Sequence, residues 1–401
     1  MLKTIISLPA LLLCILSLSA GPAHSSEWDE IVKKARGQTV YFNGWGGSDP
    51  INDYVRWAGD QVKERYQVHV KHVKVSDIGE VVSRILAEKS GGRDRGGSVD
   101  LMWINGENFN TMKQNNLLQP PYSQLLPHLP LVDSENKKST RFDFTVPVDN
   151  MEVPWGMAQL VFLYDQAHVK THPENMKELL SFARENPGRV SYPLPPNFHG
   201  TTFLKQALIE LTVDRDQLSR PVSESDFEKV TAPLWEYLDQ LHPHMWRRGT
   251  SFPANGSEMK RLLNDGELFI ALSFNPAEAS NGIATGELPE SIRTYVHDTG
   301  TIGNSHFVAI PFNASAREGA LVFANFLLSP EAQARKADPA VWGDPTVLAM
   351  NKLNPEERQL FENIPRGIAT LSPEELGTVL LEPHASWVAA LEKGWLRRYS
   401  R

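Results

Sequence analysis

Apolar runs and helical stripes alternate through the first third of the chain. The segments "TVYF", "QVHVKHVKV" and "VDLMWIN" have the short apolar or alternating patterns of strands. After each of them, apolar residues recur every three or four positions, as on one face of an amphipathic helix. The repeated strand–helix order predicts a doubly wound, mostly parallel α/β sheet.

A second region of strand and helix patterns begins at "VPWGMAQLVFLYD", residues 153–165, which predicts one long strand. It continues with a strand at "RVSYPL", a turn at "PPNFHG" and a helix at "TTFLKQALIEL". Strands at "ELFIALSF" and "SHFVAIPF" follow, and a helix from Ala316 to Leu328 comes after the last strand. The pattern therefore predicts a second α/β unit, and the length fits two domains of ~100–200 residues each.

Loops rich in glycine and tryptophan stand where such a sheet holds its ligand, beyond the carboxyl ends of its strands. "NGWGGSD" follows the first strand and "WINGENF" ends the third. Glycine lets the backbone approach a ligand closely, and the helix start at "NFHGTT" offers free N–H groups. We expect Trp45 to stack on the ligand and Gly46 and Gly47 to donate N–H groups to it. Trp155 would approach the ligand from the start of the segment 153–165. The candidate ligand-binding residues are Trp45, Gly46, Gly47, Trp103, Asn105, Glu107, Trp155, Asn197, His199, Thr201, Thr202 and Asn275.

Each of these candidates also has a plainer interpretation. Gly46 and Gly47 can be a simple turn, and Trp155 can be a core residue. Thr201 or Thr202 can be merely the cap of a helix, with no role in binding. The case for a binding site depends on the whole set lying at predicted loop ends.

The sequence contains no recognisable catalytic constellation. The opening glycines lack the Gly-Lys-Ser/Thr of a phosphate-binding loop and the third glycine of a dinucleotide fingerprint. A Gly-x-Ser-x-Gly elbow and a His-Glu-x-x-His zinc helix are also missing. We therefore expect a binding protein with no cofactor and no metal, rather than an enzyme.

The first 25 residues have the pattern of a secretory signal peptide. Lys3 precedes an apolar run that is too short to span a membrane, and small residues follow it. The only cysteine, Cys14, lies inside this run behind three leucines, whereas a lipoprotein signal has small residues there. We expect cleavage between positions 20 and 25, no lipidation, and a mature chain without disulfides.

Charge narrows the choice of partner. The chain has 48 acidic and 40 basic residues, a net charge of −8. Nucleic-acid binding needs a basic face, so this balance disfavours it. After the signal peptide, no segment is apolar enough to cross a membrane, which predicts a soluble mature protein.

"SHFVAIPFNASAREGALVFANFLLSPEAQARKA", residues 305–337, resembles the C-terminal pattern of the periplasmic substrate-binding proteins of ABC transporters, type II fold. "VPWGMAQLVFLYD" is similar to the segment in which these proteins first cross between lobes, and "NDGELFIALSF" to their helix–Gly-Glu–strand element. The likeness covers the whole mature chain. Within the family it is nearest to the uncharacterised YnjB-type proteins and, more distantly, resembles carriers of thiamine, iron and polyamines.

The resemblance implies two doubly wound lobes with a ligand cleft between them. Lobe one would hold residues 26–152 and 304–401, with the helices from 351 packed on it, and lobe two residues 157–300. Hinges would lie near 153–156 and 300–304. The protein would be a monomer that passes a small solute to an inner-membrane permease with its ATPase.

Iron is disfavoured as the solute because the sequence lacks the adjacent tyrosines of iron carriers. A cationic or heteroaromatic solute, similar to thiamine or a polyamine, suits the tryptophans, with Glu107 or Glu152 as its counter-charge. Two other interpretations stay open. One is a secreted two-lobed enzyme of transferase or sulfur-handling type, and the other is a scaffold that binds only proteins.

Overall fold

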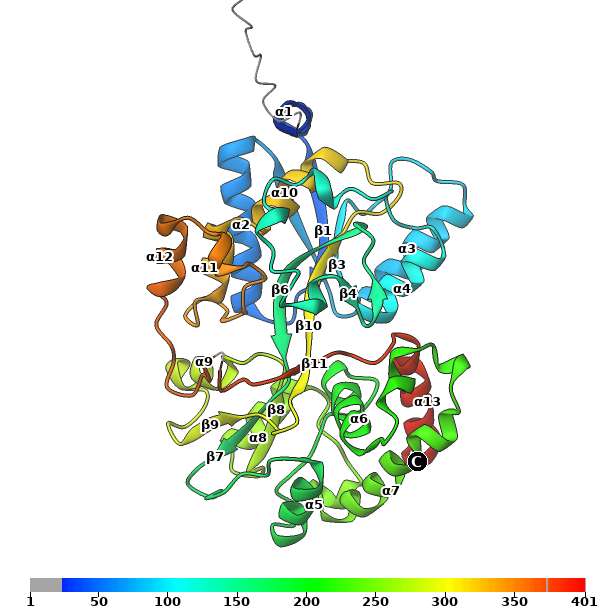
Figure 1. The fold of residues 1–401 in the computed structure, drawn as a ribbon, viewed down its shortest axis with the longest axis vertical. Coiled ribbons are helices and arrows are strands. Elements are labelled where there is room, and N and C mark those ends of the chain that lie inside the picture. The colour runs from blue at the N-terminus through cyan, green and yellow to red at the C-terminus, as the bar shows by residue number, and fades with distance from the viewer. Residues whose placement is uncertain (1–23, 373, 401) are drawn as a thin grey trace, which may run out of the picture.

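The computed structural model describes residues 24–372 and 374–400, which form two lobes joined by extended segments (Figure 1). Residues 1–23 of the predicted signal peptide lie outside the described residues, so its cleavage and lack of lipidation stay predictions. Within the two described ranges, no helix combines the length and the hydropathy needed to cross a bilayer.

The upper lobe in Figure 1 contains the predicted strand–helix repeat. Strands β1, β2 and β3 are parallel, with β1 between the other two. Strand β1 is apolar because Val40 and Phe42 are fully buried, and the stripe of the following helix packs on the same core. The elements are α1 (His24–Ala35), β1 (Thr39–Trp45), α2 (Asp49–Tyr66), β2 (His69–Val75), α3 (Ile78–Ser90), β3 (Leu101–Ile104) and α4 (Gly106–Gln114).

Two longer strands complete this sheet and lead toward the other lobe. Strand β10 (Thr301–Ala309) is antiparallel to β3 and to β6 (Glu152–Gln159), and β11 (Val379–Leu380) is parallel to β10. The sheet order is β11-β10-β3-β1-β2, with β6 also on β10. A small hairpin of β4 (Phe142–Asp143) and β5 (Val146–Pro147) lies beside it. The predicted parallel strands are therefore present, and β10 and β11 run in the opposite direction to them.

The lower lobe has a three-stranded sheet of β7 (Val161–Asp165), β8 (Ile270–Ser273) and β9 (Ile292–Tyr295). The central strand β7 is antiparallel to both neighbours, so β8 and β9 run in one direction. The predicted strand at "RVSYPL" amounts to a single parallel bridge, Val190 to Ile270. The lobe's helices are α5 (Met176–Glu185), α6 (Phe198–Leu211), α7 (Phe227–Leu241), α8 (Gly256–Asn264) and α9 (Glu278–Thr285).

The C-terminal helices do not all lie where we predicted. Helices α10 (Arg317–Leu327), α11 (Pro330–Ala337) and α12 (Pro355–Glu362) belong to the upper lobe, as expected. Helix α13 (Ser386–Tyr399) instead lies in the lower lobe (Figure 1), where Trp387, Leu391 and Trp395 join its core. These side chains form one helical stripe, and the Trp395 indole N–H donates to the Tyr192 hydroxyl at 2.8 Å. The prediction that all of residues 304–401 belong to lobe one is wrong for this helix.

Within the described residues, three segments cross between the lobes (Figure 1). The predicted single strand 153–165 is two strands, β6 and β7, separated at Leu160, whose N–H donates to the Ile302 carbonyl of the second crossing. The third crossing follows α12 and includes β11 (Figure 1). Of the two predicted hinges, 300–304 lies in the second crossing, whereas Val153 and Trp155 of the other belong to the upper core, and the bending of either stays a prediction.

Candidate functional site

Strand β1 ends in an exposed aromatic ring, that of Trp45. The Trp45 side chain is 44% exposed. Its ring covers Gly47, where an added Cβ would lie only 2.4 Å from a ring carbon. Gly46 is different, because its N–H donates to the Val75 carbonyl at 3.1 Å and a Cβ there would meet the Lys74 side chain at 2.5 Å. The Gly46 amide is therefore used by the sheet, and our prediction that it binds the ligand is wrong.

Trp155 lies in the upper core instead of facing a ligand. It has no exposed surface and packs edge-on to Trp103, with ring centroids 5.0 Å apart, and against Trp342 at 5.4 Å. The reason is that β6 is buried on both faces, so a large ring in its middle fills the core. Trp103 is half-buried in the same cluster. The core interpretation of Trp155 is therefore correct.

The start of α4 carries a half-buried carboxylate. Asn105 is the N-cap residue but makes no side-chain capping bond. The Gly106 N–H donates to Asp143 Oδ2 at 2.7 Å, which ties the helix start to the β4–β5 hairpin. Burial raises the pKa of Glu107, Lys205 lowers it, and the carboxylates of Glu382 and Asp77 raise it further.

The start of α6 faces the upper lobe from below. Asn197 caps the helix by accepting the His199 N–H at 3.1 Å, and burial lowers the pKa of His199. The Thr201 hydroxyl donates to Glu392 Oε1 on α13 at 2.7 Å, whereas Thr202 is fully buried. Asn275, after β8, uses its amide to donate to the Trp342 carbonyl at 3.2 Å.

One turn further along α6 lies a lysine that we did not predict as a site residue. Lys205 is 1% exposed, and its ammonium is 2.6 Å from Glu382 Oε2 on the third crossing. The same ammonium lies 4.4 Å from the centre of the Phe144 ring and 5.7 Å from that of Phe198. Asn304 donates to the other oxygen of Glu382 at 3.0 Å.

These groups form what we call the interlobe charge cluster, made of Asp77, Glu107, Lys205, Glu382 and Glu392. Burial raises the pKa of Glu392, Thr201 lowers it, and the charges of Glu107 and Asp77 raise it again. Since Glu107 and Asp77 belong to the upper lobe and Glu392 to α13, the cluster joins the two lobes electrostatically. With Lys205 already paired to Glu382, the remaining carboxylates are available to a cation.

The structure brings together only part of the predicted site. Glu107 is coupled electrostatically to Glu392, which accepts a hydrogen bond from Thr201, while Trp45 is exposed at the end of β1. Asn197 has a capping role, and Asn275 binds a backbone carbonyl instead. One signal for a missed residue was visible beforehand, a lysine inside the mostly apolar segment "TTFLKQALIEL". The missed residues are Asp77, Phe144, Phe198, Lys205, Glu382 and Glu392.

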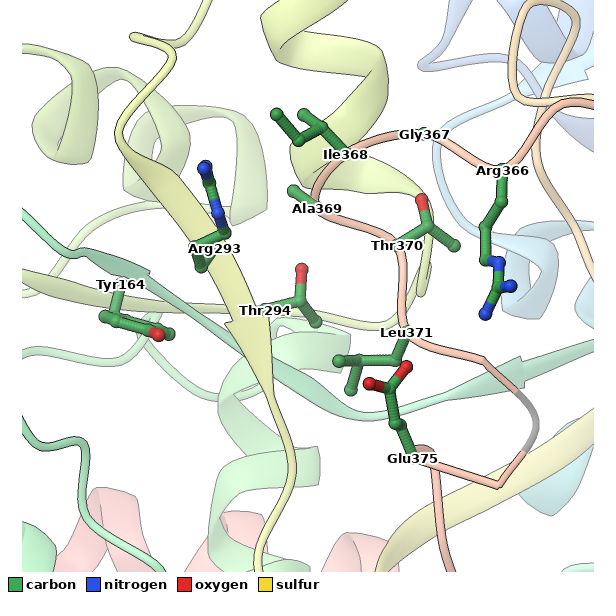
Figure 2. A pocket seen from close by; sticks show the side chains of 10 residues that line it. All are labelled: Tyr164, Arg293, Thr294, Arg366, Gly367, Ile368, Ala369, Thr370, Leu371 and Glu375. Atoms are coloured by element: carbon green, nitrogen blue, oxygen red, sulfur yellow. The ribbon is translucent and has the colours of Figure 1, made fainter.

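A separate cavity of about 330 Å³ lies on the lower lobe between β9 and the third crossing (Figure 2). Figure 2 shows Arg293 and Thr294 on the strand and Ile368 and Ala369 on the crossing. It contains none of the residues predicted for the ligand, and no segment of the upper lobe lines it. Among the described residues, no three His, Cys, Asp or Glu side chains are grouped as metal ligands.

Comparisons with a family model and with a known relative agree on one protein family. A model of the family of bacterial extracellular solute-binding proteins matches residues 57–350. Protein YnjB of Escherichia coli (strain K12) is 48% identical over 388 residues, which cover 97% of this chain and 98% of that protein. The predicted likeness to YnjB-type proteins is confirmed.

Solved structures share the fold at low identity. A putative spermidine/putrescine ABC transporter protein from Listeria monocytogenes has a TM-score of 0.63 at 16% identity, with 90% of this chain and 98% of that chain covered. A putative extracellular solute-binding protein from Bordetella parapertussis has a TM-score of 0.65 at 15% identity, with 90% and 99% covered. The protein AfuA from Actinobacillus pleuropneumoniae, with fructose-6-phosphate bound, has a TM-score of 0.60 at 14% identity, with 90% and 98% covered. These likenesses confirm the predicted two-lobed α/β fold, and because one such protein holds a sugar phosphate, the fold does not determine the ligand's charge.

Proposed function

Because this chain belongs to the bacterial extracellular solute-binding proteins, we propose that it captures a small cationic solute between its lobes and delivers it to an inner-membrane ABC permease with its ATPase. The chain is exported to the periplasm, acts there as a monomer, and closes its lobes on the solute. Trp45 and Phe198 offer ring faces to the solute, and Glu107 and Glu392 supply its counter-charge.

The observation that carries this proposal is the excess of carboxylates in the interlobe charge cluster. Burial disfavours the charged forms of Glu107 and Glu392, as their raised pKa values indicate. A cation placed between them favours both ionised forms and removes their mutual repulsion. An anionic solute would have to approach the same carboxylates, which costs free energy instead.

Two exposed aromatic rings favour the same solute class. Trp45 is 44% exposed and Phe198 is 39% exposed, although both are large and apolar. A ring face attracts a cation by roughly 0.5–2 kcal/mol, more when water is excluded. Phe198 already lies near the Lys205 ammonium, so its ring is oriented toward positive charge.

The test is to identify the solute and then titrate the carboxylate. Native mass spectrometry of protein purified from the periplasm identifies the bound molecule, which we expect to be a cation. Calorimetry should then show its affinity falling as the pH drops through the raised pKa of Glu107, since protonation removes the counter-charge. Glu107→Gln should weaken binding by about tenfold or more and flatten this pH dependence.

Glu80→Gln provides the matched control, because Glu80 is an exposed glutamate on the neighbouring helix α3. It should leave both the affinity and its pH dependence unchanged. An anionic solute in the purified protein, or an equal effect of the two substitutions, would refute the proposed cation site.

A further inference from the structure

The Lys205 ammonium lies in a site built from three separate parts of the fold. Glu382 belongs to the third crossing, Phe144 to the hairpin of the upper lobe, and Phe198 to the same helix as the lysine. We call these three side chains the ammonium cage. Ring faces together with a carboxylate are how proteins recognise ammonium ligands. The cage is therefore an ammonium-binding site whose occupant is a side chain of the protein itself.

The Phe144 ring is held in the cage by an unusual backbone. Phe144 and Thr145 have φ angles of +44° and +62°, in the left-handed region that favours glycine. Two-residue hairpin turns of this kind normally have Asn-Gly or Gly-Gly, so aromatic and β-branched residues here cost stability. Phe144 is nevertheless 4% exposed, and its carbonyl accepts the N–H of Ala385 next to α13 at 3.1 Å. The strained turn thus fixes the ring against the lower lobe.

The ammonium cage borders the part of the cluster that is left for the solute. Thr201, one turn before Lys205 on α6, binds Glu392. Glu107 interacts electrostatically with both Lys205 and Glu392. A solute held by Glu107 and Glu392 would therefore have the filled cage as its neighbour.

We propose that Lys205 determines the specificity of the site, because its ammonium fills the cage that would otherwise receive a second amino group. This proposal rests on the proposed function and makes it more specific, because the solute then has one cationic group and linear diamines are excluded. Without the lysine side chain, Glu382, Phe144 and Phe198 would surround space for an added alkylammonium ion.

Chemical rescue tests the proposal with the purified full chain. We compare wild type, Lys205→Ala and Lys205→Met in thermal unfolding with n-butylammonium, using n-butanol as the neutral control. We expect n-butylammonium to raise the unfolding temperature of Lys205→Ala alone, and n-butanol to have no such effect. Lys205→Met should not respond, because methionine fills the space without the charge. Adding Glu382→Gln to Lys205→Ala should remove the response.

Calorimetry with putrescine then tests specificity. Lys205→Ala should bind putrescine at least about tenfold more tightly than wild type does, whereas Lys205→Met should not gain affinity. No response of Lys205→Ala to n-butylammonium, an equal response of Lys205→Met, or no gain for putrescine would overturn the proposal. If Lys205→Ala does not accumulate folded, it is refolded from urea with and without n-butylammonium. Recovery only with the amine supports the cage, and no recovery overturns it.

The failure of this proposal can be told apart from failure of the proposed function. An anionic solute found by native mass spectrometry refutes the cationic solute, but it leaves the response of Lys205→Ala to n-butylammonium unaltered. Conversely, if the protein binds a monocationic solute but its Lys205→Ala variant does not respond to n-butylammonium, the proposed function stands and the ammonium cage is refuted.

Discussion

Gly156 is the residue in the first crossing whose replacement should have the clearest effect. It lies against a buried group of charges, in which Asp344 pairs with Lys336 and accepts from His306 Nε2 at 2.9 Å. A Cβ at position 156 would lie 2.1 Å from Asp344 Oδ2 and 2.9 Å from Lys336 Nζ. Its backbone φ is not in the left-handed region, so close approach, not conformational freedom, requires glycine here.

The expected loss of stability follows from the movement that an added Cβ would force on the Asp344 side chain. An ordinary contact would be about 3.4 Å, so the Asp344 carboxylate must retreat by more than about 1 Å. Lys336 is fully buried and Asp344 is 4% exposed, so a separated pair leaves both charges without water. Disrupting a buried ion pair costs about 3–5 kcal/mol, and we expect Gly156→Ala to lower the free energy of unfolding by about 3 kcal/mol.

A double-mutant cycle measured by urea unfolding checks the reasoning. Asp344→Ala removes the closest obstructing group and the ion pair but leaves His306 Cδ2 at 2.8 Å, so in that background Gly156→Ala should cost at least about 1 kcal/mol less than in wild type. The difference between the two costs is the coupling energy between residues 156 and 344. An equal cost in both backgrounds would show that the clash with Asp344 is not the reason for the glycine.

Three further predictions concern binding, pH and motion. Trp45→Ala should weaken binding of the copurifying solute by roughly threefold to thirtyfold in calorimetry, with little change in unfolding temperature because the ring is exposed. Glu152 is 1% exposed and neither carboxylate oxygen has a hydrogen-bond partner, and burial raises its pKa well above 4.5. The folded state therefore binds the proton more tightly than the unfolded state, stability falls as the pH rises above about 4.5, and urea unfolding of Glu152→Gln should show a flatter pH dependence. Small-angle scattering should give a smaller radius of gyration at saturation with solute, and an unchanged profile would indicate a rigid binder.

The elements that the sequence predicted best are those in which one face is apolar and packs on the core while the other face is polar. The stripe of α2 and the alternation of β2 arise because each has one face on the core. Strand β6 has no such alternation, because nearly all of its residues are buried. A pattern of this kind cannot distinguish a tryptophan that faces a ligand from one that faces the core, which is why Trp155 was misplaced.

The candidate site was harder to predict because its contacts join distant parts of the chain. Lys205 and Glu382 are 177 positions apart, and their pairing depends on the third crossing passing beside α6. The same packing takes α13 into the lower lobe. Loop composition after β1 and β3 indicated where the upper lobe presents its residues. It contained no information about which residues of the lower lobe would face them.

The interlobe charge cluster is difficult to explain as a device for stability. A buried ion pair such as Lys205–Glu382 is often no more stabilising than apolar side chains of similar size, because both charges lose their water. Glu107 and Glu392 are worse placed still, since each is half-buried beside other carboxylates and has a raised pKa. Sequences that depart from such local rules do so mainly at functional sites. A cation bound near Glu107 and Glu392 would offset both their burial and their mutual repulsion, so the proposed function depends most on Glu107.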